Sequence, residues 1–404
     1  MIQNQCHSLH KRSCHILILL LIIIYMSFIM LGLPSVLGSA WPVMHEQLGV
    51  SGASMGVLTI ILQGATIFAA FLSDKMIKRL GAGKLTLVSL VAIAVSLMGF
   101  SFATHFILIC LWSIPLGFGM GFIDAALNNV VAMHYKAKHM NWLHAFWGVG
   151  AAIGPLMMSA FLLRQNSWQA GYRSIGLIQV GFIVVFLLTF RLWKQIQEAP
   201  TDSEEIEQET LSSKKLLNLP GVKQSLFVFF CYCAIESAVG LWASSYLVIV
   251  RSLAEETAAL WASLYFGGIT VGRFMAGFLT VKLNHKQLIG LGSVLIGVGV
   301  IILLLPIPAH FLLLALFLIG FGCAPIFPSL MHETPNNFGV KNSGAIIGIQ
   351  MAFAYMGSML MPPLFGIIAE QISYRLFPFY IGGFLILMMV MAKWLYQKVE
   401  KKTN

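Results

Sequence analysis

Two carboxylates lie inside long apolar stretches of the sequence. Asp124 lies in a run that begins near Phe106, and Glu236 lies midway along the run 224–250; the other acidic residues fall at or beyond the ends of such runs. An ionised carboxylate at membrane depth is costly unless it faces a partner or water. A desolvated carboxylate can exchange a proton near neutral pH, and it can also bind sugar hydroxyls. Proton coupling or solute binding is therefore predicted, and a hydrogen bond between packed helices is the alternative for each residue.

The surroundings of Asp124 favour the functional interpretation. In a helix, Gly117, Gly121, Asp124 and Asn128 share one face, while Phe, Ile, Leu and Met cover the rest. We expect this small, polar face to look into a cavity. Glu236 lies on another helix, in the other half of the sequence.

Other polar and aromatic side chains in the apolar runs are weaker candidates for binding a substrate or relaying a proton. An amide can also simply join two helices, a histidine can make an interfacial hydrogen bond, and aromatic rings in membrane helices commonly serve packing. These candidates are Asn128, His144, Trp147, Trp242, Tyr246 and Gln350.

The sequence lacks the motifs of an enzyme or a metalloprotein. The six cysteines lie in or beside apolar runs without a paired framework, so we expect free thiols and no metal site. We find no nucleophile motif and no ATP-binding loop of the Gly-x-x-x-x-Gly-Lys type. We therefore expect no catalysis and no cofactor, and a gradient as the source of energy.

The composition identifies the elements that must hold these residues. Of 404 residues, 58% are hydrophobic and only 10% are charged, which excludes an ordinary soluble domain. We predict an all-α membrane protein with twelve transmembrane helices, since twelve apolar runs are long enough to cross a bilayer. The runs lie near 16–40, 52–73, 84–104, 106–133, 142–163, 174–193, 224–250, 257–281, 287–307, 310–331, 342–369 and 376–396.

The distribution of lysines and arginines predicts the orientation of the chain in the membrane. The net charge of +10 would suggest nucleic acid in a soluble chain, but here the lysines and arginines lie between apolar runs, and no nucleic acid is expected. With both termini inside, the expected outer segments hold only Arg164, Arg173, Arg251 and Arg375. Cytoplasmic loops carry the excess of basic residues. We predict a multi-pass protein of the plasma (cytoplasmic) membrane with both termini cytoplasmic.

The two halves of the sequence resemble each other. Residues 69–75 match 276–282 at an offset of 207, and the same offset pairs Gly150 with Gly357. A duplicated six-helix unit is typical of secondary transporters. We predict an N-terminal bundle over 1–194, a cytoplasmic linker over 195–222, rich in acidic residues, and a C-terminal bundle over 223–404.

The loop after the second apolar run resembles the signature loop of the major facilitator superfamily, and the twelve-helix layout extends that resemblance to the whole chain. Ala70 stands where the signature has glycine, and a signature glycine comes later, at Gly81. In that family the acid and bases of the loop form a cytoplasmic latch, which implies a gating role for a few residues here. They are Asp74, Lys75, Lys78 and Arg79. Arg273, near the inner end of its helix, can snorkel or pair with an acid.

Four stretches are similar to the fucose permease-type sugar symporters: 121–129, 144–150, 236–242 and 320–328. That resemblance implies rocker-switch alternating access and helices one, four, seven and ten around a central cavity. Asp124 and Glu236 lie on helices four and seven, so the resemblance also implies that both carboxylates face one pathway. Helix one carries no acid here, unlike the fucose permease, so the same proton scheme does not transfer directly.

Three functional hypotheses follow. The first is proton-coupled uptake of a small polar solute such as a sugar, by a monomer in the lipid bilayer. The second is a proton-coupled efflux antiporter for amphipathic or drug-like compounds, which the glycines and proline of 148–155 favour. The third, a sensor or channel, lacks a signalling segment and filter motifs.

Overall fold

The protein is almost entirely α-helical. The computed structural model describes residues 11–135, 137–165, 167–193, 213–279 and 282–403, and these contain helices and two short 3₁₀ turns but no β-strand. Within them, eleven helical spans are long and apolar enough to cross a membrane. The chain is thus a multi-pass integral membrane protein.

One of the twelve predicted spans forms a helix that is not apolar enough to count as a membrane span. The apolar run 257–281 forms the helix α12 (Glu255–Leu279), but α12 is not among the eleven spans. Its sequence carries Arg273 in the interior and two glutamates in the first turn, and these charged residues lower its mean hydropathy. The arginine is compatible with a membrane helix only if a partner compensates its charge.

Contacts divide the chain into two compact units. The first unit comprises residues 1–36 and 61–203, and the second comprises 37–60 and 204–404. The second unit therefore includes a short segment from the N-terminal part of the chain, which we call the outer segment (residues 37–60) because it lies where positive charge predicts the outer face.

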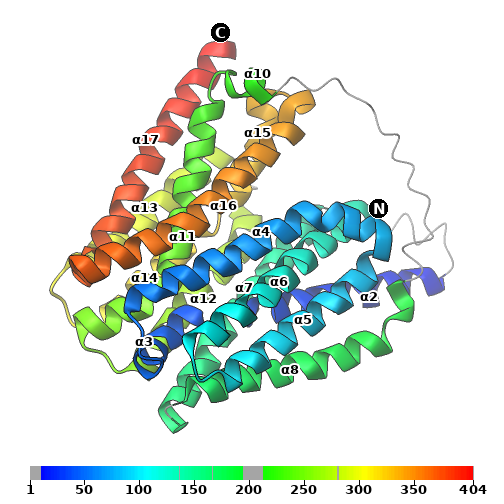
Figure 1. The fold of residues 1–404 in the computed structure, drawn as a ribbon. Helices are drawn as coiled ribbons and strands as arrows, with labels where there is room; N and C mark the ends of the chain where they lie inside the picture. Colours follow the sequence, from blue (N-terminus) through cyan, green and yellow to red (C-terminus); the bar gives the residue numbers. More distant parts are fainter. Residues whose placement is uncertain (1–10, 136, 166, 194–212, 280–281, 404) are drawn as a thin grey trace. The chain divides into compact units, whose positions relative to one another are not determined.

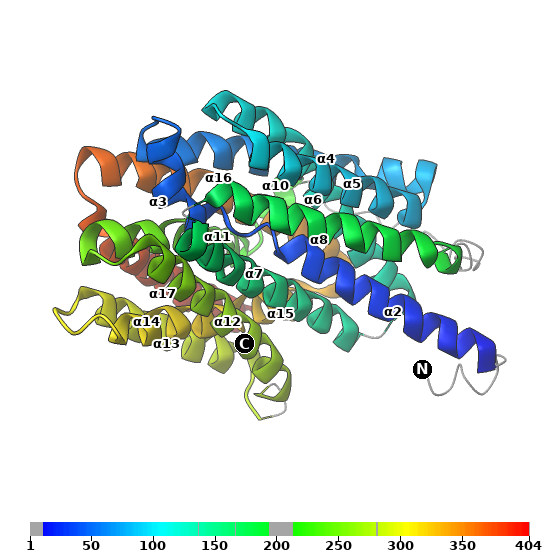
Figure 2. The ribbon, with the colours of Figure 1, turned by 90° about the horizontal axis from the view of Figure 1, so that it is seen from below.

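The first unit packs its helices through small residues. Helix α5 lies against both α6 and α8, and α2 lies against α7 (Figure 1, Figure 2). A methyl group on Gly150 of α7 would overlap the carbonyl oxygen of Ile29 on α2, so glycine there lets the two backbones approach. The helices of this unit are α2 (Lys11–Gly32), most of α4 (Met55–Leu80), α5 (Ala82–Phe102), α6 (Phe106–His134), α7 (Ala137–Gln165) and α8 (Trp168–Leu188).

The second unit is built around α11, which contacts α16, α17 and α12 (Figure 1). Gly357 of α16 lies against the carbonyl of Phe230 on α11, as Gly150 lies against α2, so residues paired by the duplication make the same kind of contact. The elements are α3 (Leu37–Gln47), η1 (Gly52–Ser54), α10 (Ser213–Leu217), α11 (Val222–Arg251), α12, α13 (His285–Leu304), α14 (Phe311–Cys323), α15 (Ile326–Phe338), α16 (Val340–Gln371), η2 (Tyr374–Leu376) and α17 (Phe377–Thr403).

Two of the apolar runs form interrupted helices. The first run breaks between α2 and α3, where Pro34 stands in a tight turn. The run from Phe311 breaks between α14 and α15 beside Pro325. Proline cannot donate the backbone hydrogen bond that would continue the preceding helix. The first break lets the outer segment belong to the second unit, although it continues a helix of the first.

Candidate functional site

Glu236 forms an ion pair inside the second unit. The Arg273 guanidinium of α12 donates from Nη2 to Glu236 Oε1 of α11 at 3.4 Å. The two side chains are only 14% and 23% exposed, for Arg273 and Glu236 respectively. A buried pair of this kind holds both charges only because each compensates the other. The arginine that makes α12 less apolar therefore has its partner on the adjacent helix.

Aromatic and thiol groups surround this ion pair. The hydroxyl of the buried Tyr265 donates to the backbone carbonyl of Glu236 at 2.9 Å. Cys323, at the end of α14, lies beside Tyr265 and is also buried. Tyr232 lies one turn before Glu236 on α11, and its ring is 6.0 Å from that of Phe327. Glu236 is thus a charged residue among closely packed aromatic side chains.

Asp124 has a different partner. The Asn128 amide, one turn later on α6, donates from Nδ2 to Asp124 Oδ1 at 3.0 Å and to the Asp124 backbone carbonyl at 2.9 Å. Among the described residues Asp124 makes no ion pair, and its side chain is partly buried. One carboxylate is therefore compensated by a cation, and the other by a neutral amide.

The glycines on the Asp124 face do not open a cavity, contrary to our expectation. A methyl group on Gly117 would overlap the carbonyl of Leu62, and one on Gly121 would overlap the carbonyl of Thr66, both on α4. Small residues bring the backbones of α4 and α6 together, which is their usual role in membrane helices. Asp124 continues the same face one turn beyond this contact.

Gln350 joins three helices of the second unit. Its side chain is fully buried, Nε2 donates to Ser225 Oγ of α11 at 2.6 Å, and Oε1 accepts from Thr334 Oγ1 of α15 at 3.1 Å. Hydrogen bonds between polar side chains commonly connect membrane helices. Both ends of the amide are therefore engaged within the protein.

Trp242 and Tyr246 are buried in packing contacts of the second unit. The indole Nε1–H of Trp242 donates to the carbonyl of Pro362 at 2.8 Å, and the Tyr246 hydroxyl donates to the carbonyl of Leu303 at 2.9 Å. The Trp242 ring lies edge-on to Phe365. Their polar atoms connect α11 to α16 and α13 respectively.

His144 and Trp147 lie on α7 in the first unit. The His144 ring meets the ring of Phe28 on α2 edge-on, with centroids 5.6 Å apart, and both His144 and Trp147 are partly buried. The backbone carbonyl of Trp147 faces Gly32 of α2 at close range. Both residues therefore belong to the α2–α7 contact.

The residues expected to gate the inner side lie at the end of α4. Lys75, Lys78 and Arg79 are exposed there, and the last two lie in the last turn of the helix. Asp74 is part of α4, but its side chain is outside the part of the chain that the structure describes. Arg273, on α12 of the second unit, pairs with Glu236.

The sequence analysis did not identify a polar contact that holds the outer segment. Ser51 Oγ donates to Glu370 Oε2 at 2.7 Å, and these residues are 319 positions apart. Nearby, the Trp41 indole donates to the carbonyl of Gly52 at 2.8 Å, and Gly56 lies against Pro363 of α16. Glu370 lies just beyond an apolar run, where a charge is unremarkable, so no sequence signal pointed to it.

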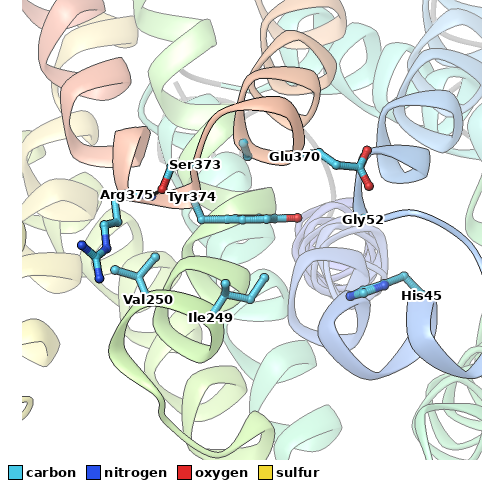
Figure 3. A pocket seen from close by; sticks show the side chains of 9 residues that line it. His45, Gly52, Ile249, Val250, Glu370, Ser373, Tyr374 and Arg375 are labelled. Carbon is cyan, nitrogen blue, oxygen red and sulfur yellow. Dashed lines mark hydrogen bonds between the residues drawn. The ribbon is translucent and has the colours of Figure 1, made fainter.

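An open cavity of about 430 Å³ lies beside this contact. Figure 3 shows the Tyr374 ring across the cavity with its hydroxyl toward Gly52, and Glu370 and Arg375 on different sides. Its lining consists of His45, Gly52, Ile249, Val250, Ala369, Glu370, Ser373, Tyr374 and Arg375.

Comparisons with known proteins agree with this architecture. The family model described as Major Facilitator Superfamily matches residues 17–261 and 247–404. The bypass of stop codon protein 6 of Saccharomyces cerevisiae is 22% identical over 378 residues, covering 84% of this chain and 75% of that protein. The glucose/mannose transporter of Bacillus subtilis is 24% identical over 302 residues, covering 72% and 73% of the two chains.

A solved structure has the same fold over nearly the full length. It is a bacterial homologue of the human lysosomal transporter Spinster, in an inward-facing and unoccupied conformation, with a TM-score of 0.70 and 13% identity. The alignment covers 97% of this chain and 98% of that structure. With the family model matching both halves, this chain is a membrane transporter that belongs to the major facilitator superfamily.

Proposed function

We propose that the protein imports a small polar solute of the sugar class together with protons, by alternating access. The observation that carries this proposal is the contrast between its two intramembrane carboxylates. Glu236 is paired with Arg273 at 3.4 Å, while the Asp124 carboxylate accepts from the Asn128 amide at 3.0 Å and pairs with no cation in the described part of the chain. The relative in Bacillus subtilis named as a glucose/mannose transporter supports the substrate class.

The two carboxylates are suited to different tasks. A carboxylate without a cation beside it is easier to protonate in an apolar environment than one held by a guanidinium. We therefore assign the coupling proton to Asp124. The guanidinium of Arg273 favours the ionised form of Glu236, whose remaining lone pairs can accept hydrogen bonds from solute hydroxyls. Loading Asp124 with a proton removes a membrane-embedded charge, which favours the conformational change that carries solute and proton together.

Alternating access requires contacts that close each side in turn. On the outer side, we assign this role to the outer segment, which is held to α16 by the Ser51–Glu370 hydrogen bond. On the inner side, the resemblance to the signature loop assigns it to Asp74, Lys75, Lys78 and Arg79. We also propose a monomer in the plasma membrane, with both termini cytoplasmic and the residues 195–222 linking two six-helix bundles.

The efflux alternative rested on the glycine-proline pattern of 148–155 and on an apolar lining. Gly150 lies against the carbonyl of Ile29 on α2, and Gly154 lies against the carbonyl of Leu33 just after α2, so close helix packing accounts for these two glycines without an antiport mechanism. We therefore prefer import as the direction of transport.

Proteoliposomes test the proposal directly. Purified protein is reconstituted, a pH gradient is imposed, and uptake of glucose, mannose and galactose is followed together with the internal pH. We expect accumulation of at least one of these sugars with protons entering alongside it. Proton exit during solute entry would support the antiporter instead, and binding of none of these sugars would refute the substrate class.

A further inference from the structure

The first unit carries an apolar groove on its membrane-facing surface. The groove has a volume of about 380 Å³ and lies where α5, α6 and α8 meet. Three of its lining side chains, Val95, Phe102 and Val180, are 48%, 64% and 45% exposed. The complete lining is Val91, Ala94, Val95, Met98, Gly99, Phe102, Trp112, Val180 and Ile183. No charged side chain contributes to it.

A glycine brings two helices together in this groove. A methyl group on Gly99 of α5 would overlap the indole of Trp112 on α6, so glycine lets that ring lie directly against α5. Both residues belong to the lining, and Val180 and Ile183 contribute to it from α8.

The length of the groove matches one leaflet of a bilayer. Along α5 the lining runs from Val91 to Phe102, which at a rise of about 1.5 Å per residue is about 16 Å. Half of a hydrocarbon core about 30 Å thick is about 15 Å. A single acyl chain of one leaflet would thus extend from the end of α5 at Phe102 to the membrane midplane near Val91.

A cation stands at the end of the groove where a lipid head group would lie. The guanidinium of Arg173, in the second turn of α8, is 4.9 Å from the centre of the Phe102 ring. Arg173 is exposed, and among the described residues it makes no ion pair. Arginine binds phosphate oxygens through two parallel N–H donors. An apolar groove of one-leaflet length, with an arginine at its mouth, is complementary to a phospholipid.

We propose that this groove is a binding site for one phospholipid molecule, with an acyl chain against Val95 and Trp112 and the phosphate on Arg173. The bound lipid would connect α5 to α8 and stabilise the first unit.

The test uses the purified full-length protein in dodecyl maltoside and phosphatidylglycerol as the probe. Native mass spectrometry counts bound lipid, and thermal unfolding measures the stabilisation as the lipid is titrated. Arg173→Gln removes the phosphate contact. Val95→Trp and Val91→Trp each fill the groove with an exposed side chain, so neither disturbs the buried core. Arg164→Gln, at the exposed end of α7, is the matched control for loss of an arginine.

We expect wild type and Arg164→Gln to bind the lipid equally. Arg173→Gln should weaken binding about tenfold, since a charge-assisted phosphate contact is worth roughly 1.5 kcal/mol or more. The tryptophan variants should lose one bound lipid. Diacylglycerol, which has the same chains without the phosphate, should bind wild type as weakly as phosphatidylglycerol binds Arg173→Gln. Unchanged lipid binding by all three groove variants, or preferential binding of a sterol, would overturn the proposal.

Discussion

Arg273 and Glu236 lie 37 positions apart in the sequence, yet their side chains meet at 3.4 Å between α12 and α11. The pair compensates the charge of the arginine that α12 carries in its interior. It also means that the two intramembrane carboxylates are chemically distinct, since Asp124 has an amide partner and no cation among the described residues. We propose that Asp124 carries the coupling proton and that Glu236 binds solute, and this assignment depends on the difference between their partners.

The ion pair predicts that substitutions of Glu236 and Arg273 have strongly coupled effects on stability. Glu236→Gln leaves the arginine uncompensated, and Arg273→Met leaves the carboxylate uncompensated, so each single variant should unfold at a lower temperature. The double variant should be more stable than the sum of the single effects predicts, with a coupling energy of about 1–3 kcal/mol. Thermal unfolding of the four purified proteins measures this cycle. The exposed Lys393→Met serves as a control, and strictly additive effects would contradict the pair.

The hydrogen bond from Ser51 to Glu370 predicts a conformational effect. Ser51→Ala removes an exposed hydrogen bond to a charged acceptor, worth about 1 kcal/mol because water competes for the carboxylate, and should release the outer segment more often. A single cysteine at Ala53 in a cysteine-free background should then react with a maleimide about fivefold faster. The neighbouring Ser54→Ala should leave that rate unchanged. Equal rates in both variants would show that the bond does not hold the segment.

The role of Gln350 can be separated from substrate binding. Gln350→Met leaves the buried hydroxyls of Ser225 and Thr334 without their partner, so the unfolding free energy should fall by about 1–3 kcal/mol. Because both ends of the amide are engaged within the protein, the KM of uptake should stay within about twofold of wild type. A large rise in KM without loss of stability would assign Gln350 to the solute.

The predicted topology can be checked independently of transport. Reporters placed after Asn404 or near Ser203 should indicate the cytoplasm, and one at Arg164 should indicate the outside, because most lysines and arginines fall in the expected inner segments. An external signal at Ser203 would contradict the orientation.

The helices followed from the sequence because each span is a long apolar run, and this signal is local. The break at Pro34 was not predicted, although proline is a local signal, because the run stays apolar across it. The sequence also showed that Asp124 and Glu236 lie inside apolar runs. Only one of their two partners could be predicted from the sequence. Asn128 lies one turn from Asp124 and was predicted on the same helix face, whereas Arg273 reaches Glu236 only through the packing of α12 on α11.

Gly117 and Gly121 were expected to face a cavity together with Asp124, and the structure instead packs these two glycines against α4. A small, polar helix face can line a cavity or allow a close helix contact, and the sequence does not distinguish these. The contact between Ser51 and Glu370 could not be predicted from the sequence, because it depends on the packing of the outer segment within the second unit.

The assignment of the coupling proton to Asp124 is tested most directly by measuring uptake and counterflow side by side for Asp124→Asn, at two pH values. Asparagine mimics the permanently protonated carboxylate, so the variant should lose pH-driven accumulation while still exchanging solute across the membrane. Asp124→Ala should be worse, because it also removes the hydrogen bond with Asn128. If Asp124→Asn retains pH-dependent accumulation and loses only thermal stability, Asp124 is a packing residue and the proposed coupling is wrong.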